Sequence, residues 1–185
     1  MLLTRIFLFT FICFSSLSAF AQSKETYIDT KNDFCFQYPD NWEVEEAEQG
    51  VVTIFSPYEA DVDSEEIDNI EEKIQITISQ WDEGSIEEFI EVNFSLESMN
   101  EVFYNFSIFK GGKEIINNLE SHWFLFAYET EQEETMAGLA YFIKNKNKII
   151  TMIGICSTDD YEPIYKDIYL EIIRSSKSYI NSRTR

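Results

Sequence analysis

Histidine is the residue on which nucleophilic catalysis in this chain would depend, and the sequence contains only one, His122. A Ser-His-Asp or Cys-His catalytic group would have to use it. No serine stands in the Gly-x-Ser-x-Gly pattern that exposes a nucleophile on a sharp turn. His122 also precedes Trp123 in a dense apolar segment, which favours a structural role. A hydrolase that uses His122 is therefore an alternative hypothesis and not the leading one.

Carboxylates are abundant, with 34 Asp and Glu residues in the chain. A glycosidase needs two carboxyl groups at a set separation, and no pair stands out from this background, so a carboxylate pair stays within the same hydrolase alternative. A structural zinc site needs four Cys or His ligands. The sequence also has no glycine-rich phosphate-binding motif. We therefore assign no catalytic residue and expect no cofactor and no zinc-type metal site.

One acidic segment has the alternation of a calcium-binding loop. Asp61, Asp63 and Glu65 alternate, and Glu72 stands at the twelfth position, where an EF-hand has its bidentate ligand. Glu66 occupies the place of the turn-forming glycine, and a strand follows instead of a helix, so we reject an EF-hand. A solvated charged loop is the default interpretation. A weak calcium-binding module at Asp61, Asp63, Glu65 and Glu66 is the alternative.

Two cysteines, Cys35 and Cys156, lie outside the N-terminal segment. A disulfide between them is one prediction, because exported compartments permit such bonds. In the chain-entropy model it would contribute roughly 4–5 kcal/mol to stability. Two separate buried thiols, each packed as a small hydrophobic side chain, are the other prediction. The sequence leaves both open.

Residues 1–21 have the pattern of a secretory signal peptide. Arg5 is the only charge, an apolar run follows it, and Ala19-Phe20-Ala21 matches the small-residue rule for cleavage before Gln22. The apolar run is shorter than the roughly 20 residues that a membrane-spanning helix needs. We therefore expect cleavage between Ala21 and Gln22, export to the periplasm or medium, and no membrane insertion of the mature protein.

The charge of the chain restricts its partners. The net charge is −20 at pH 7, and loss of Arg5 with the signal peptide makes it more negative. Nucleic acid requires a basic face, and anionic membrane surfaces also attract basic segments. Both are disfavoured, whereas solubility outside the cell and a surface for a basic protein partner or a cation are favoured.

Hydrophobic periodicity predicts the elements that would position these residues. Two helices are expected over 85–101, with Ser85 and Glu88 as a capping box, and over 160–180. Turns are expected at Gln49-Gly50, Gly111-Gly112 and 145–147. Strands are expected over 33–38, 42–47, 51–56, 73–81, 103–110, 113–116, 120–128, 136–143 and 149–156.

The last three expected strands are apolar on both faces, so both faces must be covered. This predicts an α+β fold in which an antiparallel sheet is sandwiched between helices. The domain would occupy residues 33–180, after a flexible arm over 22–32 and before a tail over 181–185.

The opening of this domain resembles a known family. The segment 34–42, FCFQYPDNW, is similar to the F-x-F-x-Y-P-x-x-W opening of PsbP-like proteins, and Val51–Pro57, Gly111-Gly112 and the closing helix also fit. That family includes an extrinsic subunit of photosystem II, a Ran-binding import factor and exported bacterial proteins. The resemblance implies a Mog/PsbP-type α/β/α sandwich and an accessory or binding role without enzymatic activity.

The leading hypothesis is therefore an exported, non-catalytic accessory or binding protein that acts through an acidic surface. The acidic loop over 59–72 and nearby sheet edges would contact a protein partner. The hydrolase alternative predicts a pocket in which His122 reaches a serine or an acid, and a packed His122 would remove that version of it.

Overall fold

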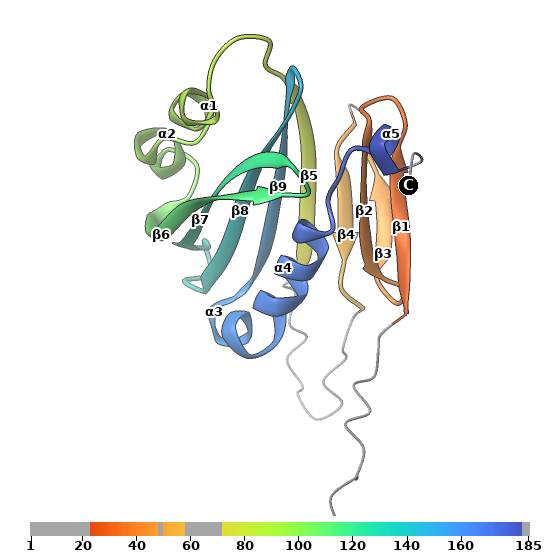
Figure 1. The fold of residues 1–185 in the computed structure, drawn as a ribbon. Coiled ribbons are helices and arrows are strands. Elements are labelled where there is room, and N and C mark those ends of the chain that lie inside the picture. Colours follow the sequence, from red (N-terminus) through yellow and green to blue (C-terminus); the bar gives the residue numbers. More distant parts are fainter. Residues whose placement is uncertain (1–22, 48–49, 58–71, 183–185) are drawn as a thin grey trace, which may run out of the picture.

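A seven-stranded antiparallel sheet forms the centre of the computed structural model, which describes residues 23–47, 50–57 and 72–182 (Figure 1). From one edge to the other its strands are β3 (Glu43–Glu46), β4 (Val52–Phe55), β5 (Lys73–Gln80), β9 (Lys148–Ser157), β8 (Thr135–Asn145), β7 (Leu119–Glu129) and β6 (Tyr104–Ile116). The hairpin around Gly50 and the turn between β8 and β9 are as predicted, because β3 pairs with β4 and β8 with β9.

Both faces of this sheet are buried. On one face, Tyr141 and Met152 pack with Tyr169 and Ile172 of helix α4 (Lys166–Arg174). On the other face, a second cluster joins Phe124 and Phe142 to Ile86 and Phe89 of helix α1 (Ile86–Asn93). Alternate residues of the central strands thus enter two separate cores, which confirms the predicted α+β sandwich.

The flexible arm predicted over 22–32 is wrong. Strand β1 (Lys24–Asp29) pairs antiparallel with β2 (Phe34–Pro39), and this two-stranded sheet packs beside α4 (Figure 1). Tyr27 stacks on Phe36 with 5.1 Å between ring centroids. Most side chains of β1 are exposed, and Tyr27 is the main apolar side chain that reaches the core. The sequence of this segment therefore has little of the apolar pattern that would predict a strand.

The hairpin turn predicted at Gly111-Gly112 is also wrong, because β6 continues through both glycines. The chain reverses instead at Asn117 and Asn118, whose φ angles of 47° and 70° are those of a tight hairpin turn. Gly112 serves packing: a Cβ there would lie 3.1 Å from Nε1 of the Trp123 indole on the neighbouring strand. Asparagine tolerates the left-handed conformation through its short polar side chain.

Each predicted helix is shorter than expected. The first is divided into α1 and α2 (Leu96–Asn100), because Ser95 interrupts it and caps α2 by accepting a hydrogen bond from Ser98 N–H. The Ser85–Glu88 capping box of α1 is confirmed.

The closing segment begins as α3 (Thr158–Asp160) and a π-helix η1 (Tyr161–Tyr165), and α4 then ends at Arg174. Beyond it, Lys177 pairs with Cys35 of β2. The final helix α5 (Tyr179–Ser182) occupies the start of the predicted tail. No helix in the described ranges combines the length and apolar character needed to cross a bilayer.

Candidate functional site

An acidic hollow lies where β6 begins and β7 turns into β8. It is a shallow, open depression of about 450 Å³, lined by Tyr104, Glu129, Thr130, Glu131 and Glu133. Tyr104 is 68 % exposed, which is unusual for a large aromatic residue in a folded protein. Carboxylates beside an accessible aromatic ring provide both ion pairing and a cation–π surface. This acidic hollow can therefore hold an ammonium or guanidinium group.

The β7–β8 turn fixes one wall of the acidic hollow. Thr130 N–H donates to the carbonyl oxygen of Glu134 (2.9 Å), and Glu133 N–H donates to that of Thr130 (3.1 Å). The Thr130 hydroxyl accepts hydrogen bonds from Gln132 N–H at 3.3 Å and Glu134 N–H at 3.2 Å. With the backbone closed in this way, Glu131 and Glu133 remain exposed.

An irregular start of β6 forms the opposite wall. The β6–β7 register shifts between Tyr104 and Ser107, and Asn105 there adopts a φ of 51°. The Asn105 side-chain amide donates to Glu129 Oε2 at 2.7 Å. A bulge of this kind redirects side chains at a sheet edge, and here it accompanies the exposure of Tyr104.

Aromatic packing beneath the acidic hollow holds both walls in place. The rings of Phe103 and Tyr128 lie 4.6 Å apart, and those of Phe106 and Phe126 lie 5.2 Å apart. These contacts join β6 and its preceding segment to β7. Val102, which precedes Phe103 in the chain, is 71 % exposed.

The sequence does not single out these residues. Their only signal is the composition of the segment 129–134, ETEQEE, which combines four acids with a threonine that can close a turn. Tyr104 gives no signal, because its exposure depends on the register shift of β6.

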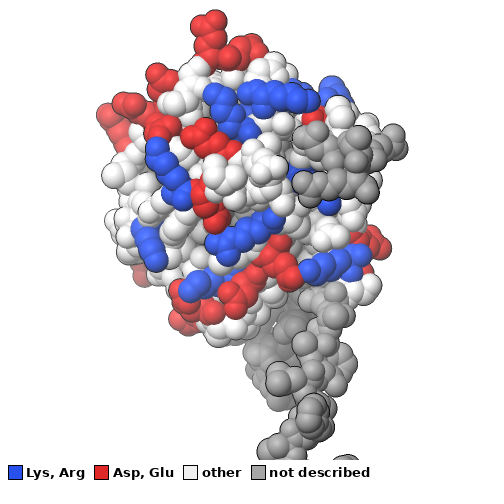
Figure 2. Space-filling model, viewed as in Figure 1, with Lys and Arg blue, Asp and Glu red and all other residues white. Residues whose placement is uncertain are grey.

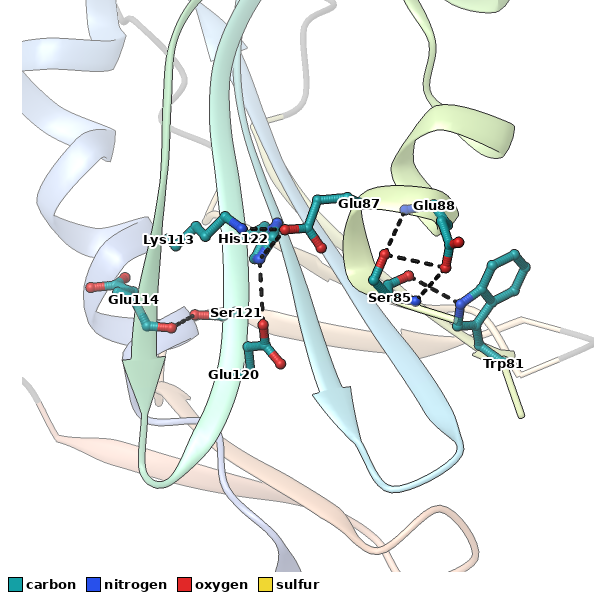
Figure 3. A network of polar contacts seen from close by, with 9 residues as sticks. All are labelled: Trp81, Ser85, Glu87, Glu88, Lys113, Glu114, Glu120, Ser121 and His122. Carbon is teal, nitrogen blue, oxygen red and sulfur yellow. Dashed lines mark hydrogen bonds and ion pairs between the residues drawn. The ribbon is translucent and has the colours of Figure 1, made fainter. Parts of the chain in front are cut away.

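His122 belongs to a different cluster, between α1 and the β6–β7 hairpin (Figure 3). It is only 5 % exposed, and its Nε2 lies 3.6 Å from Glu87 Oε1 and 3.7 Å from Glu120 Oε1. Both distances exceed hydrogen-bond length. Lys113 donates to Glu87, and this hydrogen bond is the main cause that lowers the pKa of Glu87 to about 2. The cluster joins α1 to the sheet.

This environment does not support catalysis by His122. The Ser85 hydroxyl belongs to the helix cap, where it accepts from Glu88 N–H (3.2 Å), and the Ser121 hydroxyl donates to the Glu114 carbonyl oxygen (2.9 Å) (Figure 3). His122 lines neither the acidic hollow nor the second hollow described below. The packed imidazole removes the histidine version of the hydrolase hypothesis.

The two cysteines are separate buried thiols. Cys35 is 2 % exposed and Cys156 is fully buried, and the structure joins neither in a disulfide. Cys35 Sγ contacts the carbonyl oxygen of Lys177 at 3.7 Å. Burial raises the pKa of Cys156 to about 12. Of the two alternatives drawn from the sequence, the structure contains the unbridged one.

In the folded protein without residues 1–21, both thiols are expected to resist Ellman's reagent at pH 8, because burial hinders access and thiolate formation. In denaturant without reductant, both should react at once. Adding reductant before the assay should leave the number of reactive thiols unchanged. Thiols that react only after reduction would show that a disulfide forms in solution.

The predicted calcium ligands Asp61, Asp63, Glu65 and Glu66 lie outside the described residues, as do Ala21 and Gln22 at the predicted cleavage site. Within the described ranges no group of His, Cys, Asp and Glu side chains has the arrangement of a metal site. The calcium-binding module therefore stays a prediction.

Charged side chains of both signs share the face seen in Figure 2. Lys and Arg side chains are spread over this face among the acidic ones. The turn between β8 and β9 lies at the upper end of the same view (Figure 1). The acidic hollow lies at the other end of β8, where β7 enters that strand.

Comparisons with known proteins identify the fold. Cyanobacterial PsbP from Synechocystis sp. superposes with a TM-score of 0.63 over 89 % of this chain and 98 % of its own, at 17 % identity. LpqN, described as involved in cell envelope biogenesis of Mycobacterium tuberculosis, superposes with a TM-score of 0.57 over 85 % of this chain and 84 % of its own, at 11 % identity. A Pseudomonas aeruginosa protein of unknown function superposes with a TM-score of 0.52 over 82 % of this chain and 94 % of its own, at 11 % identity. No family model and no curated protein sequence matches.

Proposed function

We propose that this chain, which has the fold of PsbP proteins, is an exported accessory protein that binds a basic segment of a partner protein in the acidic hollow. The observation that carries the proposal is the exposed ring of Tyr104 beside Glu129, Glu131 and Glu133. The signal-peptide pattern of residues 1–21 and the envelope role stated for LpqN support export.

The chemistry of the acidic hollow selects a lysine or arginine side chain. The alkyl stem of such a side chain can lie on Tyr104 while its cationic head meets the carboxylates. A net charge of −20 attracts basic partners over longer range and speeds their association. An exposed ion pair contributes only about 0.2–1 kcal/mol, so the aromatic contact is expected to provide the larger share of affinity.

The proposal predicts that Glu131→Gln with Glu133→Gln weakens binding of a fluorescent lysine-rich peptide by about 3- to 10-fold, since two exposed ion pairs are lost. Tyr104→Ala should weaken it by at least ~10-fold, as expected for an aromatic anchor. Fluorescence anisotropy at low and high salt measures both effects, and salt should weaken the wild type most.

The matched control is Glu43→Gln with Glu45→Gln, which removes the same charge from exposed positions of β3, at the opposite edge of the sheet. It should bind like the wild type. Used as bait in envelope extract, the wild type and the Glu43/Glu45 control should both retain one salt-sensitive partner. The Glu131/Glu133 variant should retain less of it, and Tyr104→Ala the least. Equal weakening by both double variants would show that net charge, and not the acidic hollow, controls binding.

A further inference from the structure

A second hollow lies at the opposite end of the strands, where four segments meet. The β1–β2 turn, the β3–β4 turn, β5 and the start of β9 surround about 450 Å³. The lining residues are Lys31, Asn32, Gly50, Ile78, Gln80 and Lys148. Gln80 and Lys148 are also directly paired across β5 and β9. We call this the basic hollow, because two lysines are the only charged residues in the described part of its lining.

These lysines are unusual in such an acidic protein. The chain has 34 acids and 14 Lys and Arg residues, yet neither Lys31 nor Lys148 forms an ion pair with any residue in the described ranges. The described acids nearby already accept hydrogen bonds: Asp29 from the lining residue Asn32, Asp33 from Lys146 and Ser178, and Asp82 from Asn147. Among the described residues, these two cationic groups thus have no carboxylate partner in the hollow.

The remaining lining groups also suit an anion. Lys148 Nζ donates to Asn32 Oδ1 at 2.6 Å, which holds the ammonium at the wall and leaves its other N–H donors available. Gln80 Oε1 accepts from Asn147 Nδ2 at 3.3 Å, so the amide NH₂ of Gln80 is a further donor. Lysine binds phosphate as a point charge, whereas planar bidentate recognition of carboxylates favours arginine.

We propose that the basic hollow binds a small phosphate-bearing anion, through the ammonium groups of Lys31 and Lys148 and the amide of Gln80. Its volume falls within the ~300–1,000 Å³ that is usual for small-molecule sites. Half-buried Ile78 gives it one apolar wall, which suits the organic part of a phosphate ester or a lipid headgroup. The basic hollow and the acidic hollow lie at opposite ends of the sheet, so they can be occupied independently.

Inorganic phosphate, titrated into the purified chain by calorimetry at low ionic strength, tests the site directly. Lys31→Gln with Lys148→Gln should weaken binding by at least ~10-fold. Lys110→Gln is the matched control, because this exposed lysine of β6 lies at the far edge of the sheet; it should leave binding within about twofold. Circular dichroism of each variant confirms folding, which the exposed position of Lys31 favours.

Three results would overturn the proposal: no phosphate binding, equal binding of acetate, or equal binding by the double variant. A flotation assay then distinguishes two sources of the same chemistry. Recovery with phosphatidylglycerol vesicles but not phosphatidylcholine vesicles, lost in the double variant, assigns the phosphate to a lipid headgroup. Phosphate binding without flotation assigns it to a soluble anion.

Discussion

Replacing Asp33 by alanine is expected to lower the free energy of unfolding by about 3 kcal/mol, since hydrogen bonds to a buried charge are lost together. Asp33 is 8 % exposed. Its carboxylate accepts from Ile180 N–H (2.7 Å), Lys146 Nζ (2.7 Å) and the Ser178 hydroxyl (2.9 Å). One side chain thus joins the β1–β2 turn, the β8–β9 turn and the C-terminal segment. Urea unfolding followed by circular dichroism measures the loss.

The pH dependence separates this role from simple packing. Burial alone would raise the pKa of Asp33, but hydrogen bonds from Lys146, Ile180 and Ser178 hold that pKa below its usual value. A carboxyl group with a lowered pKa stabilises the fold above its unfolded pKa of about 4, and the contribution is lost as pH falls through the folded pKa. The stability difference between wild type and Asp33→Asn should therefore be large at pH 7 and shrink below about pH 4.

Asp40→Asn is the control, because Asp40 is exposed in the turn after β2. It should follow the wild type at both pH values. A loss below ~0.5 kcal/mol in Asp33→Ala would contradict the structural role. So would a difference between wild type and Asp33→Asn that persists unchanged in acid.

Local rules in the sequence predict much of this fold. The alternation of Ile74 and Ile76 with polar neighbours predicts β5, and Ser85 with Glu88 predicts the start of α1. These features depend on residues close together in the chain, so a single sequence displays them. The central strands, apolar on both faces, predict the two covering layers for the same reason.

Two of the errors have one physical cause, which is that a distant residue decides the local structure. β1 has little apolar pattern and is held by Tyr27 on Phe36 and by pairing with β2. Gly111-Gly112 has the composition of a turn, yet β6 stays extended through both glycines, and a Cβ at Gly112 would lie only 3.1 Å from the Trp123 indole. Tertiary packing overrides propensity in both cases.

The candidate sites are harder to predict than the fold. The acidic hollow needs Tyr104 and the turn after Glu129 to meet, and the basic hollow needs Lys31 and Lys148, more than a hundred positions apart in the chain. Charge composition predicts an acidic surface, but only the register of β6 on β7 and the position of β1–β2 bring these side chains together.

Gly138→Ala is expected to cost about 3 kcal/mol in stability, at the upper end for an added methyl group in a packed core. Gly138 lies in the first half of β8, opposite Phe126 of β7. A Cβ at this position would stand 2.1 Å from Phe126 Cζ, and the Phe126 ring is itself held against Phe106 and Phe124. The ring cannot move aside without disturbing the aromatic packing that supports the acidic hollow.

A double-mutant cycle identifies the cause of this loss. Phe126→Leu alone should destabilise by removing aromatic contacts, but combined with Gly138→Ala it frees the space that the new methyl group needs. The double variant should therefore be more stable than the sum of the two single losses predicts, by at least ~1 kcal/mol. Additive losses would show that Gly138 is required for its backbone conformation instead. Because the same ring supports Phe106, Gly138→Ala should also weaken peptide binding at Tyr104, and Phe126→Leu should restore part of it.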